Sequence, residues 1–310
     1  MSAHAAPRTR VTLGALAAKK DAGEPIVMVT AYDHPGAQIV EEAGVDMVLV
    51  GDSAAMTVLG YESTVPVTVD EMLMLTKAVR RGLTVPLLVG DLPFGSYEAS
   101  DELAIATAQR FVKEAGVDLV KIERGGSTVD RARALVRSGI PVVGHVGLTP
   151  QTATALGGYR AQGRTADAAL TVIDDALALQ DAGCSLLVIE AVPSEVTSAL
   201  MPLLDIPVIG IGAGSDADGQ VLVFHDLLGL YDGGAAKFVR RYADLRGAAV
   251  AGVAEYAAEV RGGVYPGVEH GYAMPAEEAA RLGELLAERE VDTRSAGSPR
   301  TAAGSPAGVR

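Results

Sequence analysis

The chain has 310 residues and a formal net charge of −13 at pH 7. Hydrophobic residues make up 49% of it, enough for a sizeable core, but aromatic residues make up only 4% and tryptophan is absent, so the core must be aliphatic. The acidic balance argues against a nucleic-acid partner, because binding a phosphate backbone requires clustered lysine and arginine.

The cysteine content and the hydropathy pattern indicate the cellular compartment of the protein. Cys184 is the only cysteine, so no intrachain disulfide can form. It stands at the start of an expected strand, and we interpret it as a packing residue. No apolar run approaches the roughly 18 residues that a membrane span requires, and the first ten residues do not resemble a secretory signal. We therefore expect a cytoplasmic protein without membrane contact.

Residues 1–10 lack a hydrophobic pattern, and we predict that they form a flexible N-terminal arm.

Beyond residue 10, three segments repeat one pattern: a helix-like stretch, Ala-Gly, a short apolar run and an acid. Glycine suits the left-handed end of a helix, and a run with few polar positions predicts a strand buried on both faces. The acids that end these runs therefore occupy equivalent places. The segments are Glu41–Asp52, Lys113–Glu123 and Gln180–Glu190.

Eight short apolar runs in all are predicted to be strands. They are Ile26–Thr30, Val45–Gly51, Pro86–Gly90, Leu119–Ile122, Pro141–Val146, Leu186–Ile189, Pro207–Ile211 and Val221–Phe224. Helical spacing of apolar residues separates several of them, at Thr68–Arg81 behind a capping-box pattern, at Ser100–Ala115 and at Thr165–Ala182. This alternation predicts a (β/α)8 TIM barrel. A doubly wound open sheet is the alternative, although no GxGxxG follows the first strand.

We assign residues 11–274 to the barrel, as one catalytic domain. Residues 275–290 can form a surface helix. The final residues, 291–310, contain almost no large apolar side chains and are expected to be a disordered tail without function.

An acidic residue follows four of the predicted strands. Two of these acids, Asp52 and Asp91, stand in the same Val-Gly-Asp context. The carboxyl ends of parallel strands share one rim of a barrel, where active sites are found, so these acids should converge there. Such a cluster requires a cation or a proton, and oxygen ligands without cysteine indicate Mg²⁺. For any single acid, a helix cap or turn remains an alternative. The acids are Asp52, Asp91, Glu123 and Glu190.

Two further polar residues lie inside apolar strands. Lys121 is two residues before Glu123, so both side chains should face the barrel interior. A buried ammonium requires a carboxylate partner or an anionic substrate, and a purely structural Lys–Glu pair is the alternative. His145 could support the metal site through a hydrogen bond, or could be an ordinary hydrogen-bonded core residue.

Eight stretches between about Arg10 and His270 closely resemble the ketopantoate hydroxymethyltransferase family. They are VGDSAAMTVLGYESTVPVT, VGDLPFGSY, VKIERGG, GHVGLTPQT, GGYRAQGR, VIEAVPSEV, VIGIGAGSDADGQVLVFHDLLG and VYPGVEH. The resemblance implies a barrel of the phosphoenolpyruvate/pyruvate type, one Mg²⁺ per subunit and a homo-oligomer, a decamer. The implied reaction moves a one-carbon unit from 5,10-methylenetetrahydrofolate to 3-methyl-2-oxobutanoate through a Mg²⁺-stabilised enolate. It yields ketopantoate for pantothenate and coenzyme A biosynthesis.

The resemblance also assigns roles to single residues. Glu190, in VIE, matches the family's catalytic base. The implied metal ligands are Asp52, Asp91 and Glu123. The implied ketoacid contacts are Asp52, Ser53, Asp91 and Lys121. Arg124 stands where the family runs directly from glutamate to glycines, and nothing in the resemblance extends to the tail beyond His270.

Two other functions remain open from sequence. A carbon–carbon lyase or phosphonomutase on the same barrel type would also bind Mg²⁺ and 2-oxo acids, but its Lys-x-Cys-Gly-His stretch is missing. A non-catalytic barrel that only binds a metal or ketoacid would leave Glu190 as a costly charge without a role.

Overall fold

The computed structural model describes residues 9–234 and 236–296. Eight parallel strands form a closed barrel in chain order, and β1 pairs with β8 to complete it. This confirms the predicted barrel and excludes the open sheet. The strands are β1 (Ile26–Thr30), β2 (Met47–Val50), β3 (Leu87–Asp91), β4 (Leu119–Glu123), β5 (Val142–Gly147), β6 (Leu186–Glu190), β7 (Val208–Ile211) and β8 (Gly219–Leu222).

The last strand begins earlier than the sequence pattern predicts. It opens with Gly219 and Gln220, which carry no hydrophobic signal, and Phe224 already belongs to the short helix α9 (Phe224–Leu227). A glycine is required at the start because a Cβ at Gly219 would lie 2.3 Å from the carbonyl oxygen of Ile26 on the neighbouring strand. Close backbone approach, and not hydrophobicity, therefore fixes this end of the barrel.

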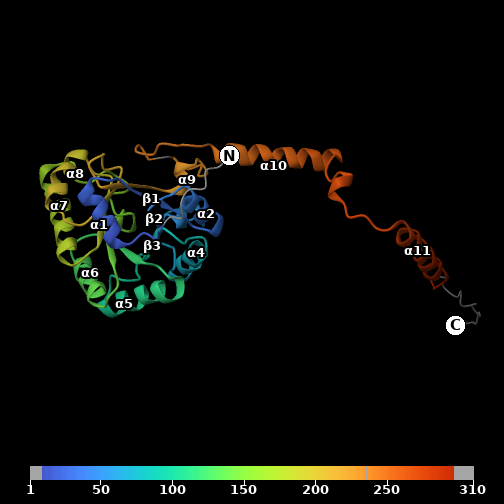
Figure 1. Cartoon of the computed structure of the whole chain (residues 1–310), viewed down its shortest axis with the longest axis horizontal. Coiled ribbons are helices and arrows are strands. Elements are labelled where there is room, and N and C mark those ends of the chain that lie inside the picture. Colours follow the sequence, from blue (N-terminus) through green and yellow to red (C-terminus); the bar gives the residue numbers. More distant parts are fainter. Residues whose placement is uncertain (1–8, 235, 297–310) are drawn as a thin grey trace, which may run out of the picture. The chain divides into compact units, whose positions relative to one another are not determined.

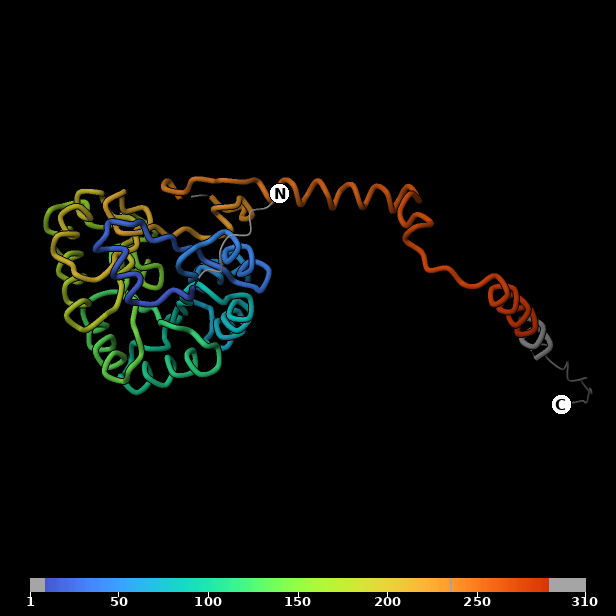
Figure 2. Tube along the Cα trace, viewed as in Figure 1, coloured from blue at the N-terminus to red at the C-terminus, as the bar shows by residue number. Residues whose placement is uncertain are grey.

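Helices surround the strands, as Figures 1 and 2 show. Thr68 caps α4 through the predicted capping box with Glu71. The helix expected over residues 100–115 is α5 followed by one π-helical turn, η1 (Phe111–Ala115). The helices of the barrel are α1 (Leu13–Ala22), α2 (His34–Glu42), α3 (Ala54–Thr57), α4 (Val69–Arg81), α5 (Asp101–Arg110), α6 (Thr128–Arg137), α7 (Ala166–Asp181), α8 (Ser194–Leu200) and α9.

Successive residues of each strand face opposite sides of the barrel wall, and β4 shows why this matters for the site. Val120 and Ile122 pack outward in the layer between strands and helices, whereas Leu119 belongs to the cluster inside the barrel. Lys121 and Glu123 share the inward side with Leu119. Leu16 of α1 is fully buried against the inner cluster, so the interior is a packed core and not a pore.

The chain divides into two compact units, Met1–Gly247 and Ala248–Arg310, and the first contains all eight strands. The second contains most of α10 (Leu245–Gly262) and all of α11 (Ala276–Ala296). The surface helix predicted over residues 275–290 corresponds to α11, which continues through part of the expected tail. The remaining tail residues, 297–310, and arm residues 1–8 lie outside the described residues. The assignment of residues 11–274 to one catalytic domain stays a prediction.

Among the residues that the structure describes, no helix is both long and apolar enough to cross a membrane.

Burial of the single cysteine leads to a chemical prediction. Cys184 is 3% exposed within the outer core layer, and this burial raises the pKa of its thiol to about 12. The thiol should therefore stay protonated and inaccessible at pH 7–9. We expect no reaction of the folded protein with a disulfide reagent over this range, and one thiol per chain after unfolding in guanidinium. Rapid reaction of the folded protein would contradict this assignment.

Candidate active site

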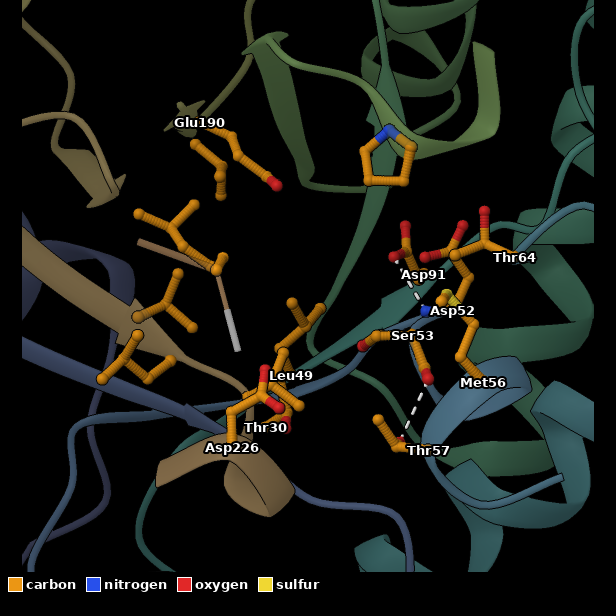
Figure 3. Close-up of a pocket in the computed structure, with 18 of the residues that line it drawn as sticks. Thr30, Leu49, Asp52, Ser53, Met56, Thr57, Thr64, Asp91, Glu190 and Asp226 are labelled. Atoms are coloured by element: carbon orange, nitrogen blue, oxygen red, sulfur yellow. Dashed lines mark hydrogen bonds between the residues drawn. The ribbon is translucent and has the colours of Figure 1, made fainter. Parts of the chain in front are cut away.

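The four predicted acids meet at one rim of the barrel, where they line a single cavity of about 450 Å³ (Figure 3). Asp91, Glu123 and Glu190 are the last residues of β3, β4 and β6, and Asp52 follows β2 by two residues. Ser53, Lys121 and His145 line the same cavity. The structure thus brings together every residue that the sequence singled out for the site. Their individual roles stay predictions.

The two Val-Gly-Asp motifs have different physical reasons for their glycines. A Cβ at Gly51 would lie 2.9 Å from Oγ of Ser53, on the side of the turn that faces the site. A Cβ at Gly90 would lie 2.7 Å from the ring of Phe111, in the layer between strand and helix. Each glycine allows a close contact that positions the aspartate beside it.

Three of the acids are arranged as ligands for one cation. Asp52, Asp91 and Glu123 each offer a carboxylate oxygen, and these oxygens all lie within 4.8 Å of one another. All three side chains are buried, at 1–4% exposure. The backbone N–H of Asp52 donates to Oδ2 of Asp91 at 3.1 Å, which links the first two.

One buried ammonium lies among these carboxylates. Nζ of Lys121 is 2.9 Å from Oδ1 of Asp91 and 3.1 Å from Oε1 of Glu123. Burial by itself lowers the pKa of Lys121, but the attraction of the surrounding carboxylates outweighs it and the net pKa is raised. Lys121 is therefore a permanent positive charge at the base of the site.

One ammonium does not neutralise three carboxylates, and the remaining negative charge affects the pKa of Asp52 most strongly. Burial, followed by repulsion from Asp91 and Glu123, raises the pKa of Asp52 well above its ordinary value. Burial also raises the pKa of Asp91, although Lys121 opposes this. A divalent cation among the oxygens would keep all three ionised, and an all-carboxylate set suits a hard cation such as Mg²⁺. The residues therefore fit the metal that the sequence predicts.

His145 lies between the carboxylate trio of Asp52, Asp91 and Glu123 and the fourth acid, Glu190. Its Nδ1 is 3.1 Å from Oε1 of Glu123, and its Nε2 is 3.3 Å from Oε2 of Glu190. Burial and the nearby Lys121 lower the pKa of His145. The Glu123 carboxylate and the nearby Glu190 raise it by more, so the net pKa is raised. The ring therefore hydrogen-bonds Glu123 through Nδ1 and lies within ion-pair distance of Glu190 through Nε2.

The sequence did not predict the network that positions the acids, which depends on Gln151 and Tyr97. The backbone N–H of Gln151 donates to Oε2 of Glu123 at 3.0 Å, and its side-chain Nε2 donates to Oδ2 of Asp52 at 3.1 Å. The Tyr97 hydroxyl donates to Oε1 of Gln151 at 2.6 Å and accepts from the backbone N–H of Glu123. Both residues lie in motifs quoted above, GLTPQT and GDLPFGSY, but only the folded chain shows what they contact.

Gln151 therefore contacts two of the three predicted metal ligands at once. Because it occupies one oxygen of Asp52, it leaves the other oxygen, Oδ1, available to a cation. Such outer contacts fix the orientation of metal-binding carboxylates.

Ser53 is held by another residue that sequence reasoning missed. The Tyr32 hydroxyl and Oγ of Ser53 are 2.8 Å apart, and Tyr32 is 3% exposed. Burial raises the pKa of Tyr32 to about 12, so the phenol remains protonated and can donate or accept this hydrogen bond.

Two of the acids are followed by a left-handed backbone residue that is not glycine. Arg124, after Glu123, has φ of 77°, and Ala191, after Glu190, has φ of 46°. The chain therefore turns sharply away as soon as each carboxylate has been placed at the rim.

Comparison with known proteins agrees with this geometry. Residues 10–268 match the family described as ketopantoate hydroxymethyltransferase. The 3-methyl-2-oxobutanoate hydroxymethyltransferase of Moorella thermoacetica is 52% identical over 267 residues, which cover 86% of this chain and 99% of that protein. The protein of the same name from Oleidesulfovibrio alaskensis is 50% identical over 284 residues, covering 92% and 98%.

Among solved structures, 2,3-dimethylmalate lyase, a member of the PEP mutase/isocitrate lyase superfamily, matches with a TM-score of 0.53 and 16% identity, over 91% of this chain and 98% of that one. At this identity the likeness shows the fold alone, and it agrees with the closed (β/α)8 barrel.

The Gln151 network generates a prediction about metal binding. Gln151→Leu keeps a similar volume but removes the amide that holds Asp52, so we expect Mg²⁺ to bind about 10–100-fold more weakly. Titration calorimetry with Mg²⁺, or electron paramagnetic resonance with Mn²⁺, measures this directly. Gln162→Leu is the matched control, because within the described residues that side-chain amide donates to the carbonyl of Arg160 and contacts none of the acids. Unchanged metal affinity in Gln151→Leu would show that the network has no part in ligand placement.

Proposed function

Because the chain belongs to the ketopantoate hydroxymethyltransferase family, we propose that this cavity transfers a hydroxymethyl group to 3-methyl-2-oxobutanoate. The chain is an enzyme, a one-carbon transferase, and its product is ketopantoate for pantothenate and coenzyme A biosynthesis. Family membership decides against the lyase and scaffold alternatives. One geometric observation supports the proposal most: a carboxylate trio fit for a cation shares its cavity with a separate carboxylate, Glu190.

We propose 5,10-methylenetetrahydrofolate as the donor of the one-carbon unit. In the net reaction, C3 of the ketoacid loses its proton and forms a carbon–carbon bond to the methylene carbon. The two bonds from that carbon to the folate nitrogens break, water supplies the new hydroxyl oxygen, and tetrahydrofolate leaves.

Asp52, Asp91 and Glu123 would hold one Mg²⁺ at the base of the cavity. When bound, the cation would polarise the ketone of the substrate and stabilise the negative charge that grows on its oxygen as the C3 proton is lost. Tyr97 and Gln151 keep two of these carboxylates in place, so little reorganisation is required when the substrate arrives.

Lys121 and Ser53 bind the substrate in this proposal. The Lys121 ammonium lies beside Asp91, where it attracts the carboxylate of the ketoacid and offsets charge on the ketone oxygen. Oγ of Ser53 can donate a hydrogen bond to the substrate while it accepts one from Tyr32. Together they orient C3 away from the base of the cavity.

Glu190 removes the C3 proton. It comes from β6, on another side of the cavity from Asp52 and Asp91 in Figure 3, so it is not part of the carboxylate trio. Its side chain is 15% exposed, and Oε2 lies 3.3 Å from Nε2 of His145. A carboxylate in this position can accept a proton from carbon.

One assay tests the proposed function directly. The purified protein is mixed with Mg²⁺, 3-methyl-2-oxobutanoate and 5,10-methylenetetrahydrofolate, and ketopantoate is measured. Absence of ketopantoate, with intact folded protein, would contradict the proposal.

The role of Glu190 can be tested without the folate. In D₂O, the protein with Mg²⁺ and ketoacid should exchange the C3 proton for deuterium, as measured by NMR. We expect Glu190→Gln to slow this exchange by about 10²–10⁴-fold, the usual contribution of a general base. Glu195→Gln removes an exposed carboxylate nearby and serves as the control. Exchange at the parent rate in Glu190→Gln would assign the base elsewhere.

The same exchange tests the cation. Because Asp91 belongs to the trio and EDTA removes divalent ions, we expect no exchange in Asp91→Asn or after EDTA treatment of the parent. Exchange that persists in both would remove the metal from the reaction.

We also propose that the protein is a homo-oligomer, a decamer, as the family resemblance implies. Helix α10 supports this, because its large apolar side chains are 38–68% exposed, far more than a monomer usually leaves in one stripe. These side chains are Leu245, Val250, Val253, Tyr256 and Val260. The cytoplasmic location stays a prediction.

The state of assembly is measured by light scattering after size-exclusion chromatography. We expect one large species for the parent protein and smaller species for Val253→Glu, which puts a charge into the apolar stripe of α10. Glu255→Gln, on another face of the helix, should leave the assembly unchanged. A monomeric parent protein would overturn the proposal.

A further inference from the structure

The cavity is larger than a small ketoacid requires. Its volume, about 450 Å³, lies within the range of roughly 300–1,000 Å³ that accommodates drug-sized ligands. The carboxylate trio and Lys121 come from the segments around β2, β3 and β4. The segments around β7 and β8 line the same cavity with aliphatic and aromatic side chains, among them Ile211, Val223 and Phe238.

One carboxylate, Asp226, interrupts this apolar wall. It belongs to α9, directly after β8, and its side chain lines the cavity beside Thr30 and Leu49 (Figure 3). It is half-buried, and burial raises its pKa, while Arg241 acts in the opposite direction. A carboxylate in such surroundings is costly unless donors compensate it.

No described residue supplies those donors. Among residues 9–234 and 236–296, the Asp226 carboxylate takes part in no hydrogen bond or ion pair. It is not a helix cap either, because Val223 occupies that position without a side-chain cap. Asp226 lies in the first turn of α9, a favourable place for an acid, but its carboxylate oxygens are left without a hydrogen-bond donor among the described residues and line the cavity.

We propose that Asp226 binds the pyrimidine edge of the pterin of the one-carbon donor, with the pterin ring against the apolar wall of β7 and β8. This inference rests on the proposed function, since it takes 5,10-methylenetetrahydrofolate as the donor. The edge presents two neighbouring donors, the 2-amino group and N3–H. A single carboxylate accepts such a pair through parallel hydrogen bonds, as it does from a guanidinium.

The placement of Asp226 suits the direction of transfer. In Figure 3, Glu190 and Asp226 lie on opposite sides of the cavity, with Asp52 and Asp91 on a third side. In the pterin, the 2-amino edge lies at the far end of the ring system from C6 and the N5–N10 bridge that carries the methylene. When the 2-amino edge binds Asp226, the methylene group therefore points back across the cavity. It then faces C3 of the ketoacid, from which Glu190 removes the proton.

The apolar wall completes the site. A flat ring loses little by leaving water when both faces contact aliphatic or aromatic side chains, and its polar edge then provides the specificity. The same wall excludes water from the path between the two reacting carbons.

The test separates the two halves of the reaction. Loss of a charged hydrogen-bond acceptor in Asp226→Asn should raise the KM for 5,10-methylenetetrahydrofolate by about 10–100-fold. Deuterium exchange at C3 of the ketoacid, which requires no folate, should stay within about twofold of the parent rate. Asp205→Asn, an exposed acid away from the cavity, removes the same charge and should change neither measurement.

A modified ligand makes the test specific for the contact. A 2-desamino analogue of tetrahydrofolate lacks one of the two donors, so it should bind the parent protein more weakly than tetrahydrofolate, as calorimetry measures. Asp226→Asn should bind both ligands about equally, because the partner of the amino group is already gone. A merely structural role for Asp226 would weaken both ligands alike and keep their ratio.

Three outcomes would overturn the proposal: an unchanged KM for the donor in Asp226→Asn, an equal loss of deuterium exchange, or an unchanged preference for the 2-amino group. Failure of the proposed function itself looks different, because the parent protein would then form no ketopantoate.

Discussion

The site depends on one buried charge interaction, between the ammonium of Lys121 and the carboxylates of Asp91 and Glu123. Without it, three buried carboxylates with oxygens within 4.8 Å would repel one another. One ammonium reduces that repulsion but leaves net negative charge. The barrel thus tolerates the cluster in the folded chain, and a divalent cation among the three oxygens would offset the remaining charge.

Barrel geometry makes this interaction possible. Parallel strands end at one rim, and alternation along β4 points Lys121 and Glu123 inward together. The hydrogen bonds of Gln151 then join residues from the ends of β2 and β4 through the segment after β5. Because these strands are already fixed by the closed sheet, the network adds orientation to groups that are close for topological reasons. Binding and positioning are therefore consequences of the same fold.

Sequence patterns predicted the eight strands and the rim acids, because buried strands and repeated Ala-Gly turns leave strong local signals. They placed β8 too late, since Gly219 is needed for close packing and carries no hydrophobic signal. They also missed Tyr32, Tyr97 and Gln151, whose partners are distant in the chain: Gln151 and Asp52 are separated by 99 residues. Periodicity reports on the face that a residue occupies, whereas a side-chain hydrogen bond depends on the relative placement of several elements.

The left-handed residues after Glu123 and Glu190 have a consequence for sequence drift. A side chain at positive φ costs roughly 1–2 kcal/mol, whereas glycine loses roughly 0.5–1 kcal/mol in extra freedom of the unfolded chain. The difference leaves a net cost of about 0–1.5 kcal/mol for a side chain at position 124 or 191. A substitution one residue beyond each acid therefore changes the stability of the fold only modestly. A difference at position 124 or 191 between two members of the family is poor evidence that their chemistry differs.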